Sequence, residues 1–334
     1  MKLCTFVTAT DGPKAAIRVG DSIFDIERSI ECLGGSVPPG RYDSVLGILR
    51  VGPEVMSELR RLEEAIESAL DSDRFARARS TLSEVRLLAP VPRPNSIRDF
   101  LAFEEHLVNS TRAVVKRMFP PIEWLDAASR KVLRRPLLRP PSVWYELPVY
   151  YKGNPNTVVG PEARIEWPAY STELDYELEF GIYLWKTGKD IAKSEARSFI
   201  AGYTIFNDMS ARDVQFREME ARLGPAKGKD FDTGNVMGPY LVTPDEVVDP
   251  YGLSMRAYVN DELWSEGSSS AMHHGFEEMI AHVSRSETLH PGDFFGSGTV
   301  GTGCGLELGR RLRKGDRVTL EVDRLGRLSN PIGN

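Results

Sequence analysis

The sequence predicts an α+β fold that is mainly β, with a small N-terminal domain over residues 1–90 and a larger domain over residues 91–334. After about residue 150, short strand-like runs outnumber helical ones and do not alternate with them, which argues against a doubly wound parallel sheet. Prolines at positions 90, 92 and 94 are typical of a boundary or an extended linker. A chain of 334 residues can form one large domain or two ordinary ones with a real core.

The N-terminal part is expected to be β-rich with one long helix. The runs AAIRV and SIFDIE flank Gly20-Asp21, which predicts a β-hairpin. Apolar residues recur at helical spacing within residues 53–78 and predict a helix there. Ser96 followed by Asp99 resembles a capping box, so a second helix is expected to begin at Ser96. Residues 120–148 are rich in Pro, Arg and Trp without periodicity and predict an irregular insertion over a site.

The rest of the chain predicts strands with one interrupting helix. LDYELEFGIYL alternates, TIFND and PYLVT are short and β-rich, and RAYVNDELW predicts a hairpin that turns at Asn260-Asp261. FEEMIAHVSR predicts an amphipathic helix. The C-terminal run RKGDRVTLEVDRLGRLSN predicts strand and turn.

Charge and cysteine content restrict the partners. A net charge of −6 argues against nucleic acid or an anionic membrane as the main partner, and a cluster at Arg134, Arg135 and Arg139 is interpreted as a local anion-attracting patch. The three cysteines show no CxxC spacing, which favours a reducing compartment and argues against a structural zinc site. The N-terminal apolar stretch is too short for a secretory signal, and no apolar run reaches membrane-spanning length. A cytoplasmic protein is expected.

An acidic strand is the central candidate feature. On a strand, Asp175, Glu177 and Glu179 share one face, whereas on a helix the carboxylates two residues apart would diverge. Acidic residues are poor strand formers, so several on one face need a reason. A bound cation and a solvated acidic face both explain this pattern.

Further polar residues could complete such a site. Asp208 ends an apolar strand, where it could be an oxygen ligand or could cap the following helix. Lys229, in a Gly-rich turn, could stabilise developing negative charge or could simply be solvated. Asp99 and His106 are seven residues apart and would share a face of the predicted helix, offering a carboxylate to a metal and an imidazole to a water. Helix capping by Asp99 and a structural role for His106 remain alternatives.

One motif is rejected on its context. Residues 296–301 read GSGTVG and match the GxGxxG spacing, but a dinucleotide fingerprint requires a helix to follow, and here TGCGLELG follows. Nicotinamide binding is therefore not expected.

Taken together, these stretches closely resemble the fumarylacetoacetate hydrolase family. The matching stretches are DFLAFEEH, LDYELEFGIYL, GYTIFNDMSARDVQ, LGPAKGKDFDTGNVMGPY, LHPGDFFGSGTVGTG and LRKGDRVTLEVDRLGRLSNPI, from about residue 90 to the end. The resemblance implies a mixed β-sandwich or β-roll catalytic domain behind the smaller N-terminal domain.

The resemblance also implies roles for individual residues. It implies metal ligands at Glu177, Glu179 and Asp208, with Asp99 as a fourth. The remaining implied roles are a general base at His106, an orienting carboxylate at Glu307, oxyanion and carbanion stabilisation by Arg212, Gln215 and Lys229, and substrate contacts at Tyr151, Thr299 and Arg117. Carboxylate ligands without His or Cys suit Mg²⁺, or Mn²⁺ or Ca²⁺, better than zinc.

The implied activity is metal-dependent hydrolysis of a C–C bond in a β-diketo acid, such as a fumarylacetoacetate-like or acylpyruvate-like compound, by a homodimer. Asn109 stands where one branch of the family has a glutamate three residues after the histidine, which argues against that branch's decarboxylases. The alternatives are a decarboxylase, an isomerase or a hydratase of a related oxo acid, and a catalytically silent metal-binding or ligand-binding relative.

Overall fold

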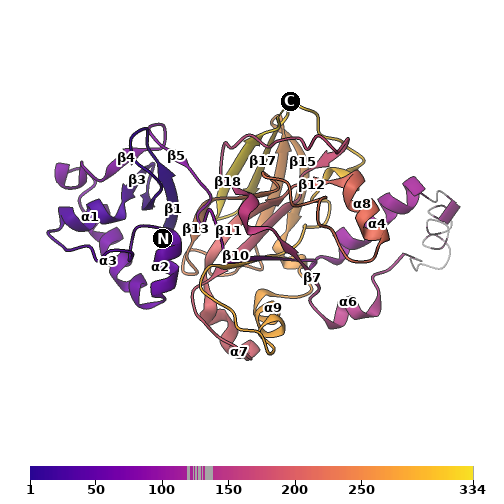
Figure 1. Cartoon of the computed structure of the whole chain (residues 1–334), viewed down its shortest axis with the longest axis horizontal. Helices are drawn as coiled ribbons and strands as arrows, with labels where there is room; N and C mark the ends of the chain where they lie inside the picture. The colour runs from indigo at the N-terminus through magenta and orange to yellow at the C-terminus, as the bar shows by residue number, and fades with distance from the viewer. Residues whose placement is uncertain are drawn as a thin grey trace.

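The computed structural model confirms a mainly β, α+β fold (Figure 1). The structure describes residues 1–118, 121, 122, 124, 126, 129, 131 and 138–333. Within these residues a mixed 12-stranded sheet, an antiparallel 4-stranded sheet and a 2-stranded pair make up the strand content. No helix of the described residues is long and apolar enough to cross a lipid bilayer.

The described residues contain 18 strands. They are β1 (Lys2–Val7), β2 (Lys14–Val19), β3 (Ser22–Asp25), β4 (Arg79–Thr81), β5 (Arg86–Leu87), β6 (Ser96–Phe100), β7 (Tyr150–Gly153), β8 (Val158–Val159), β9 (Leu174–Asp175), β10 (Leu178–Leu184), β11 (Ile200–Asp208), β12 (Ser210–Ala211), β13 (Asn235–Val242), β14 (Ser254–Val259), β15 (Glu262–Ser268), β16 (Asp293–Gly296), β17 (Arg317–Val322) and β18 (Gly326–Pro331). The two predicted hairpins are confirmed as β2–β3 and β14–β15.

The helices of the described residues range from 4 to 15 residues in length. They are α1 (Ile26–Cys32), α2 (Val45–Val51), α3 (Glu54–Glu67), α4 (Glu104–Met118), α6 (Ser142–Glu146), α7 (Lys193–Ala196), α8 (Arg212–Glu220), α9 (Phe276–Val283) and α10 (Gly305–Leu308), with single 3₁₀ turns at η1 (Asp73–Phe75), η2 (Pro155–Thr157), η3 (Arg197–Phe199) and η4 (Ser269–Ala271). The helix predicted within 53–78 is α3, which ends at Glu67 rather than extending to residue 78. The insertion predicted over 120–148 lies partly outside the described residues and contains α6.

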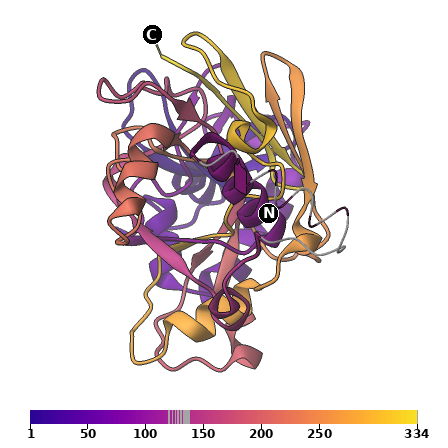
Figure 2. The same ribbon diagram turned by 90° about the vertical axis from the view of Figure 1, so that its right-hand side faces the viewer.

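The large sheet joins the N-terminal strands to strands of the rest of the chain. Its strand order is β4-β3-β2-β1-β13-β11-β10-β16-β6-β7, so β1 pairs with β13 and the N-terminal strands extend the same sheet. Helices α1, α2 and α3 lie at one end of the molecule, and α4 and α6 lie at the other, the end that faces the viewer in Figure 2 (Figures 1 and 2). The division at residue 90 remains a prediction.

Apolar layers cover both faces of the central strands. On β10, Phe180 and Ile182 pack into the core shared with the 4-stranded sheet, whereas Tyr183 packs into the core beneath α2 and α3. Every residue of β10 is consequently buried, including Glu179. Because β10 is buried on both faces, the Glu179 carboxylate lies inside the protein, where it needs a compensating charge.

The helix predicted to begin at Ser96 is wrong. Residues 96–100 form β6, which pairs in parallel with β16 and antiparallel with β7. The Ser96 hydroxyl donates to Asp293, so it does not cap a helix, and α4 begins at Glu104. Asp99 therefore lies on a strand and His106 on a helix, and their predicted placement on one helical face is also wrong. Pairing with a strand nearly 200 residues away outweighed the local helix-start pattern.

Candidate metal and proton-transfer site

Three acidic side chains meet on neighbouring strands of the large sheet. Asp208 ends β11, Glu179 lies on β10 and Asp99 lies on β6, and β11, β10, β16 and β6 are consecutive. Gly296, on the intervening β16, is the register partner of Asp99. A Cβ atom at Gly296 would lie 2.2 Å from Asp99 Oδ1, so glycine at this point lets the Asp99 carboxylate lie over β16 toward Glu179.

Gly296→Ala is therefore expected to displace the Asp99 carboxylate and to weaken Mn²⁺ binding by about tenfold or more. The added methyl group should also cost about 1–3 kcal/mol of unfolding free energy. Electron paramagnetic resonance titration with Mn²⁺ measures the binding. Gly12→Ala is the matched control, because a Cβ at Gly12 meets no atom within 4 Å. A folded Gly296→Ala protein with unchanged Mn²⁺ affinity would contradict the assignment of Asp99 as a ligand.

The chemistry of this cluster fits a hard divalent cation. One carboxylate oxygen from each of Asp99, Glu179 and Asp208 lies within 4.8 Å of the others, and all three side chains are buried. Burial raises the pKa of each carboxyl group, and neighbouring carboxylates raise the pKa values of Asp99 and Glu179 further. The buried Oδ1 atoms of Asp99 and Asp208 have no hydrogen-bond partner. Three converging carboxylates with unpaired oxygens suit Mg²⁺, Mn²⁺ or Ca²⁺.

Several alternatives left open by the sequence are decided by burial and capping. Asp175, Glu177 and Glu179 are 3%, 4% and 0% exposed, so the acidic face is not solvated. Asp208 does not cap α8, since the N-cap is Ala211 and no side chain accepts a capping hydrogen bond there. Lys229 is buried rather than solvated.

Glu177 is held by cations instead of lying within the three-carboxylate cluster. It lies in the break between β9 and β10, and its two oxygens accept hydrogen bonds from Arg212 and Lys229. Burial acts to raise the pKa of Glu177, but Arg212, Lys229 and His106 outweigh it, so the pKa lies well below its usual range. The Lys229 ammonium group also donates to Asp208, and it therefore lies between two of the predicted metal ligands. Burial acts to lower the pKa of Lys229, but these two carboxylates raise it above its usual value.

His106 and Glu307 form a buried pair beside the carboxylates. His106 Nδ1 lies 2.7 Å from Glu307 Oε1, and His106 Nε2 lies 3.9 Å from Glu177 Oε1. A carboxylate oxygen accepts, so the ring proton is assigned to Nδ1 and the Nε2 lone pair lies on the side of Glu177. The second Glu307 oxygen accepts from the Thr302 backbone N–H, which holds the carboxylate in place. The structure thus brings together the two residues predicted as base and orienting group.

Asp175 is a site residue to which the sequence argument gave no role. It accepts a hydrogen bond from Arg212 and further ones from the backbone N–H groups of Gly305-Leu306. The carboxylate therefore ties Arg212 to the first turn of α10, the helix that carries Glu307. Gln215, one turn along α8, accepts from Arg212 and completes this arrangement. The signal available in the sequence was the first acid of the Asp-x-Glu-x-Glu pattern.

Two predicted substrate contacts lie against the carboxylates in this structure. Tyr151 donates its hydroxyl proton to Asp208 Oδ2 over 2.7 Å, and Thr299 donates to Glu179 Oε1 over 3.1 Å. The Gly298 backbone N–H donates to the other oxygen of Glu179. Burial, followed by the nearby carboxylates, raises the pKa of Tyr151 well above its usual value, so this phenol remains a donor.

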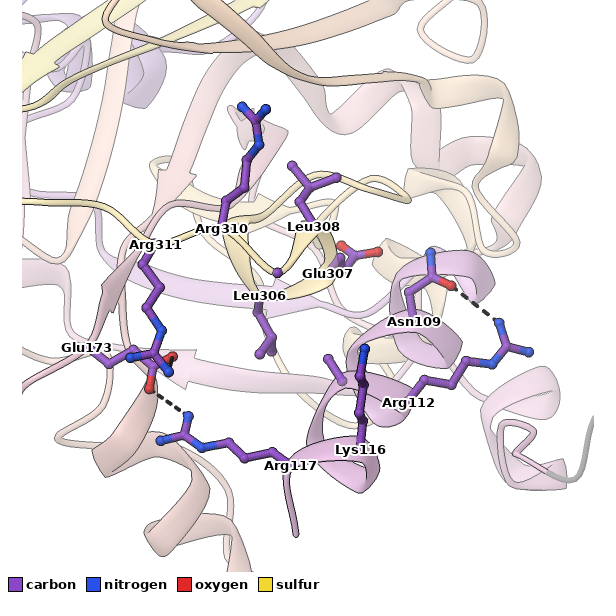
Figure 3. A pocket seen from close by; sticks show the side chains of 13 residues that line it. Asn109, Arg112, Lys116, Arg117, Glu173, Leu306, Glu307, Leu308, Arg310 and Arg311 are labelled. Carbon is purple, nitrogen blue, oxygen red and sulfur yellow. Dashed lines mark hydrogen bonds and ion pairs between the residues drawn. The ribbon is translucent and has the colours of Figure 1, made fainter. Parts of the chain in front are cut away.

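A basic cleft of about 670 Å³ opens beside the His106–Glu307 pair, between α4 and α10 (Figure 3). Glu307 lines this cleft together with arginine and lysine side chains. Arg117 lies in this cleft and pairs with Glu173 at 2.6 Å, and Arg311 approaches the same carboxylate at 3.6 Å. The charged residues lining the cleft are Arg112, Lys116, Arg117, Arg310 and Arg311 against Glu173 and Glu307. Of the predicted patch at Arg134, Arg135 and Arg139, the first two lie outside the described residues.

The sequence over residues 97–333 matches the family described as fumarylacetoacetate (FAA) hydrolase C-terminal. The chain belongs to this family. The predicted resemblance is confirmed, and the match covers the elements from β7 to β18, the helices from α4 to α10 and the carboxylates of Asp99, Glu179 and Asp208.

Individual relatives differ in their named activities. The oxaloacetate tautomerase fahd2 of Xenopus laevis is 32% identical over 271 residues, covering 80% of this chain and 74% of that protein. The oxaloacetate tautomerase YisK of Bacillus subtilis is 30% identical over 291 residues, covering 87% and 86%. A maleylpyruvate hydrolase from Sphingobium sp. SYK-6, solved with manganese(II) and pyruvate, is 25% identical, with a TM-score of 0.67 over the full length of both chains.

Proposed function

We propose that this protein is a divalent-metal-dependent enzyme that moves a proton on an enolisable 2-oxo acid and interconverts the keto and enol forms of a small 2-oxo dicarboxylate such as oxaloacetate. The observation that carries the proposal is the fixed imidazole of His106. Glu307 holds Nδ1, and Nε2, with its lone pair available, lies 3.9 Å from Glu177, the carboxylate that shares Lys229 with Asp208. An oriented, buried base beside a cation site is the arrangement that proton transfer next to a carbonyl requires.

The roles of the residues follow from their contacts. Asp99, Glu179 and Asp208 would hold the metal, with Glu177 beside them. When bound, the ion is a Lewis acid that polarises a carbonyl oxygen. His106 Nε2 takes the proton from one position of the substrate and returns it to the other. Lys229 remains protonated, as its raised pKa requires, and its positive charge stabilises the enolate.

The named activities of the relatives support tautomerisation as the first candidate. Two relatives of at least 30% identity that cover most of this chain are oxaloacetate tautomerases. The C–C hydrolysis predicted from the sequence is the second candidate, because a His106–Glu307 pair can equally activate a water molecule. The maleylpyruvate hydrolase relative supports this second candidate.

One substrate panel separates the candidates. Purified protein with Mg²⁺ is given enol-oxaloacetate, acylpyruvates and fumarylacetoacetate-like diketo acids. We expect accelerated loss of the ultraviolet absorbance of the enol, with no pyruvate formed from the acylpyruvates and no carbon dioxide released. His106→Gln is the control for tautomerisation by the free metal. Pyruvate formation from an acylpyruvate would instead establish the hydrolase, and enol loss no faster than with His106→Gln would reject the tautomerase.

The proposal extends to substrate attraction, oligomeric state and location. Arg117, in the basic cleft, would attract a substrate carboxylate. The protein would act as a homodimer. It would be located in the cytoplasm.

A further inference from the structure

A second group of side chains with metal-ligand atoms includes the base His106 itself. Cys304 Sγ lies 3.4 Å from Glu307 Oε1, the same oxygen that accepts from His106 Nδ1 at 2.7 Å. One ligand atom from each of His106, Cys304 and Glu307 lies within 4.8 Å of the others. Neither the hard-cation site nor the proton-transfer role uses the thiol. His106, Cys304 and Glu307 together form a thiol triad.

The spacing of the thiol triad is close to that of a tetrahedral zinc site. With Zn–S near 2.3 Å and Zn–N and Zn–O near 2.1 Å, neighbouring ligand atoms lie roughly 3.4–3.6 Å apart. The distance from Cys304 Sγ to Glu307 Oε1 already has this value, at 3.4 Å. The distance from His106 Nδ1 to Glu307 Oε1 must open, from 2.7 Å by roughly 0.7 Å, as the metal replaces the proton between them.

The ligand types separate the thiol triad from the carboxylate cluster. Sulfur and imidazole nitrogen favour Zn²⁺, whereas carboxylate oxygens alone favour Mg²⁺, Mn²⁺ or Ca²⁺. A thiolate and a carboxylate neutralise both charges of Zn²⁺, so the complex is neutral in a buried place. Glu307 also lines the basic cleft, so the cleft reaches one member of the thiol triad (Figure 3).

We propose that the thiol triad of His106, Cys304 and Glu307 binds Zn²⁺ and that the bound ion switches off proton transfer. Zinc takes the Nδ1 lone pair, so the single ring proton moves to Nε2, which can then no longer accept a proton. The Cys304 thiol loses its proton to solvent as the S–Zn bond forms. Solvent supplies the fourth ligand. One proton is thus released for each zinc ion bound, and nothing is oxidised or reduced.

Binding is tested without substrate, so the test is independent of the proposed reaction. Metal-free protein is titrated with Co²⁺, a spectroscopic substitute for zinc, in the presence of excess Mg²⁺. We expect one equivalent to produce a thiolate-to-cobalt charge-transfer band that added Zn²⁺ removes, with one proton released per ion. Cys304→Ser should abolish the band.

The control variants keep this test decisive even if Cys304→Ser fails to fold. The doubly substituted Cys4→Ala, Cys32→Ser protein retains Cys304 alone and should keep the full band. Asp208→Asn, which alters the carboxylate cluster, should also keep it. Loss of the band in the doubly substituted protein, or its persistence in Cys304→Ser, overturns the proposal.

Inhibition is the functional measurement. Zinc added to the magnesium-loaded enzyme should reduce turnover, and the effect should be reversed by a chelator that prefers zinc to magnesium. Loss of an outer-shell partner alone costs about 10- to 100-fold in metal affinity, so loss of the thiolate ligand should raise the inhibitory zinc concentration at least about tenfold. Equal zinc sensitivity of the wild type and Cys304→Ser would show that zinc acts elsewhere and would overturn the switch.

Discussion

Replacing His106 with alanine is expected to lower kcat by about 10²- to 10⁴-fold while leaving Mn²⁺ binding unchanged. The imidazole is the group whose Nε2 lies on the side of Glu177, and it lies outside the three-carboxylate cluster. Removing it therefore removes the base but no ligand of the hard cation. Steady-state turnover and Mn²⁺ titration by electron paramagnetic resonance measure the two properties separately.

His106→Gln is the matched variant. The glutamine amide can still donate to Glu307, so this buried carboxylate is not left unpaired, yet an amide cannot accept a proton near neutral pH. Both variants should lose turnover to a similar extent. Added imidazole should partly restore turnover only in His106→Ala, where the side-chain volume is empty. Turnover close to that of the wild type in His106→Ala would reject the base assignment under either candidate reaction.

The elements that the sequence predicted well are those whose signal is local. The hairpins at Gly20-Asp21 and Asn260-Asp261, and the helix α9, follow from turn residues and periodicity within a few positions. The segment from Ser96 could not be assigned in this way, because its strand state depends on β16, which lies almost 200 residues later. A Ser-x-x-Asp pattern alone does not distinguish a helix start from a strand that a distant segment completes.

The sequence predicted the side chains that the structure brings together, but it could not predict how their charges pair. The family resemblance predicted roles for Glu177, Lys229 and Asp208, and in the structure Lys229 contacts both carboxylates. The Lys229 contacts to both carboxylates depend on a turn that folds back onto β11, which no local pattern shows. No role of its own was predicted for Gly296, which lies in the rejected nucleotide motif and in one of the family-like stretches, although its missing side chain is what admits the Asp99 carboxylate.

The positive charge of Lys229 should weaken the binding of a cation at the carboxylate cluster. Its ammonium group lies between Glu177 and Asp208 and balances part of the buried negative charge without a metal. A divalent ion at the cluster must share Asp208 with this ammonium group, so the two positive charges repel. The oxygens of Asp99 and Asp208 without partners are the ones left for the ion. Binding should therefore depend strongly on each remaining carboxylate charge.

Asp208→Asn is accordingly expected to abolish the stabilisation that Mg²⁺ or Mn²⁺ gives to the metal-free protein. The wild type should gain about 2.7 kcal/mol of unfolding free energy at a free metal concentration of about 100 Kd. Asparagine can keep the acceptor that Tyr151 and Lys229 use, and it places its amide nitrogen at the unpaired Oδ1 position, where it cannot bind a cation. The fold is thus preserved while a ligand is lost.

Calorimetric unfolding of the metal-free and metal-loaded proteins measures this difference, and turnover of the stripped enzyme after addition of each metal accompanies it. Mg²⁺ or Mn²⁺ should restore activity to the wild type but not to Asp208→Asn. Asp232→Asn removes an exposed charge three residues after Lys229 and controls for net charge. If Asp208→Asn were stabilised by Mn²⁺ as strongly as the wild type, or if zinc alone restored the stripped wild type, the carboxylate cluster would not be the catalytic metal site. Restoration by Mg²⁺ or Mn²⁺, together with inhibition by Zn²⁺, would assign the two kinds of ion to different atoms. Mg²⁺ or Mn²⁺ would bind the carboxylates of β6, β10 and β11, and Zn²⁺ would bind the thiol triad, which includes His106.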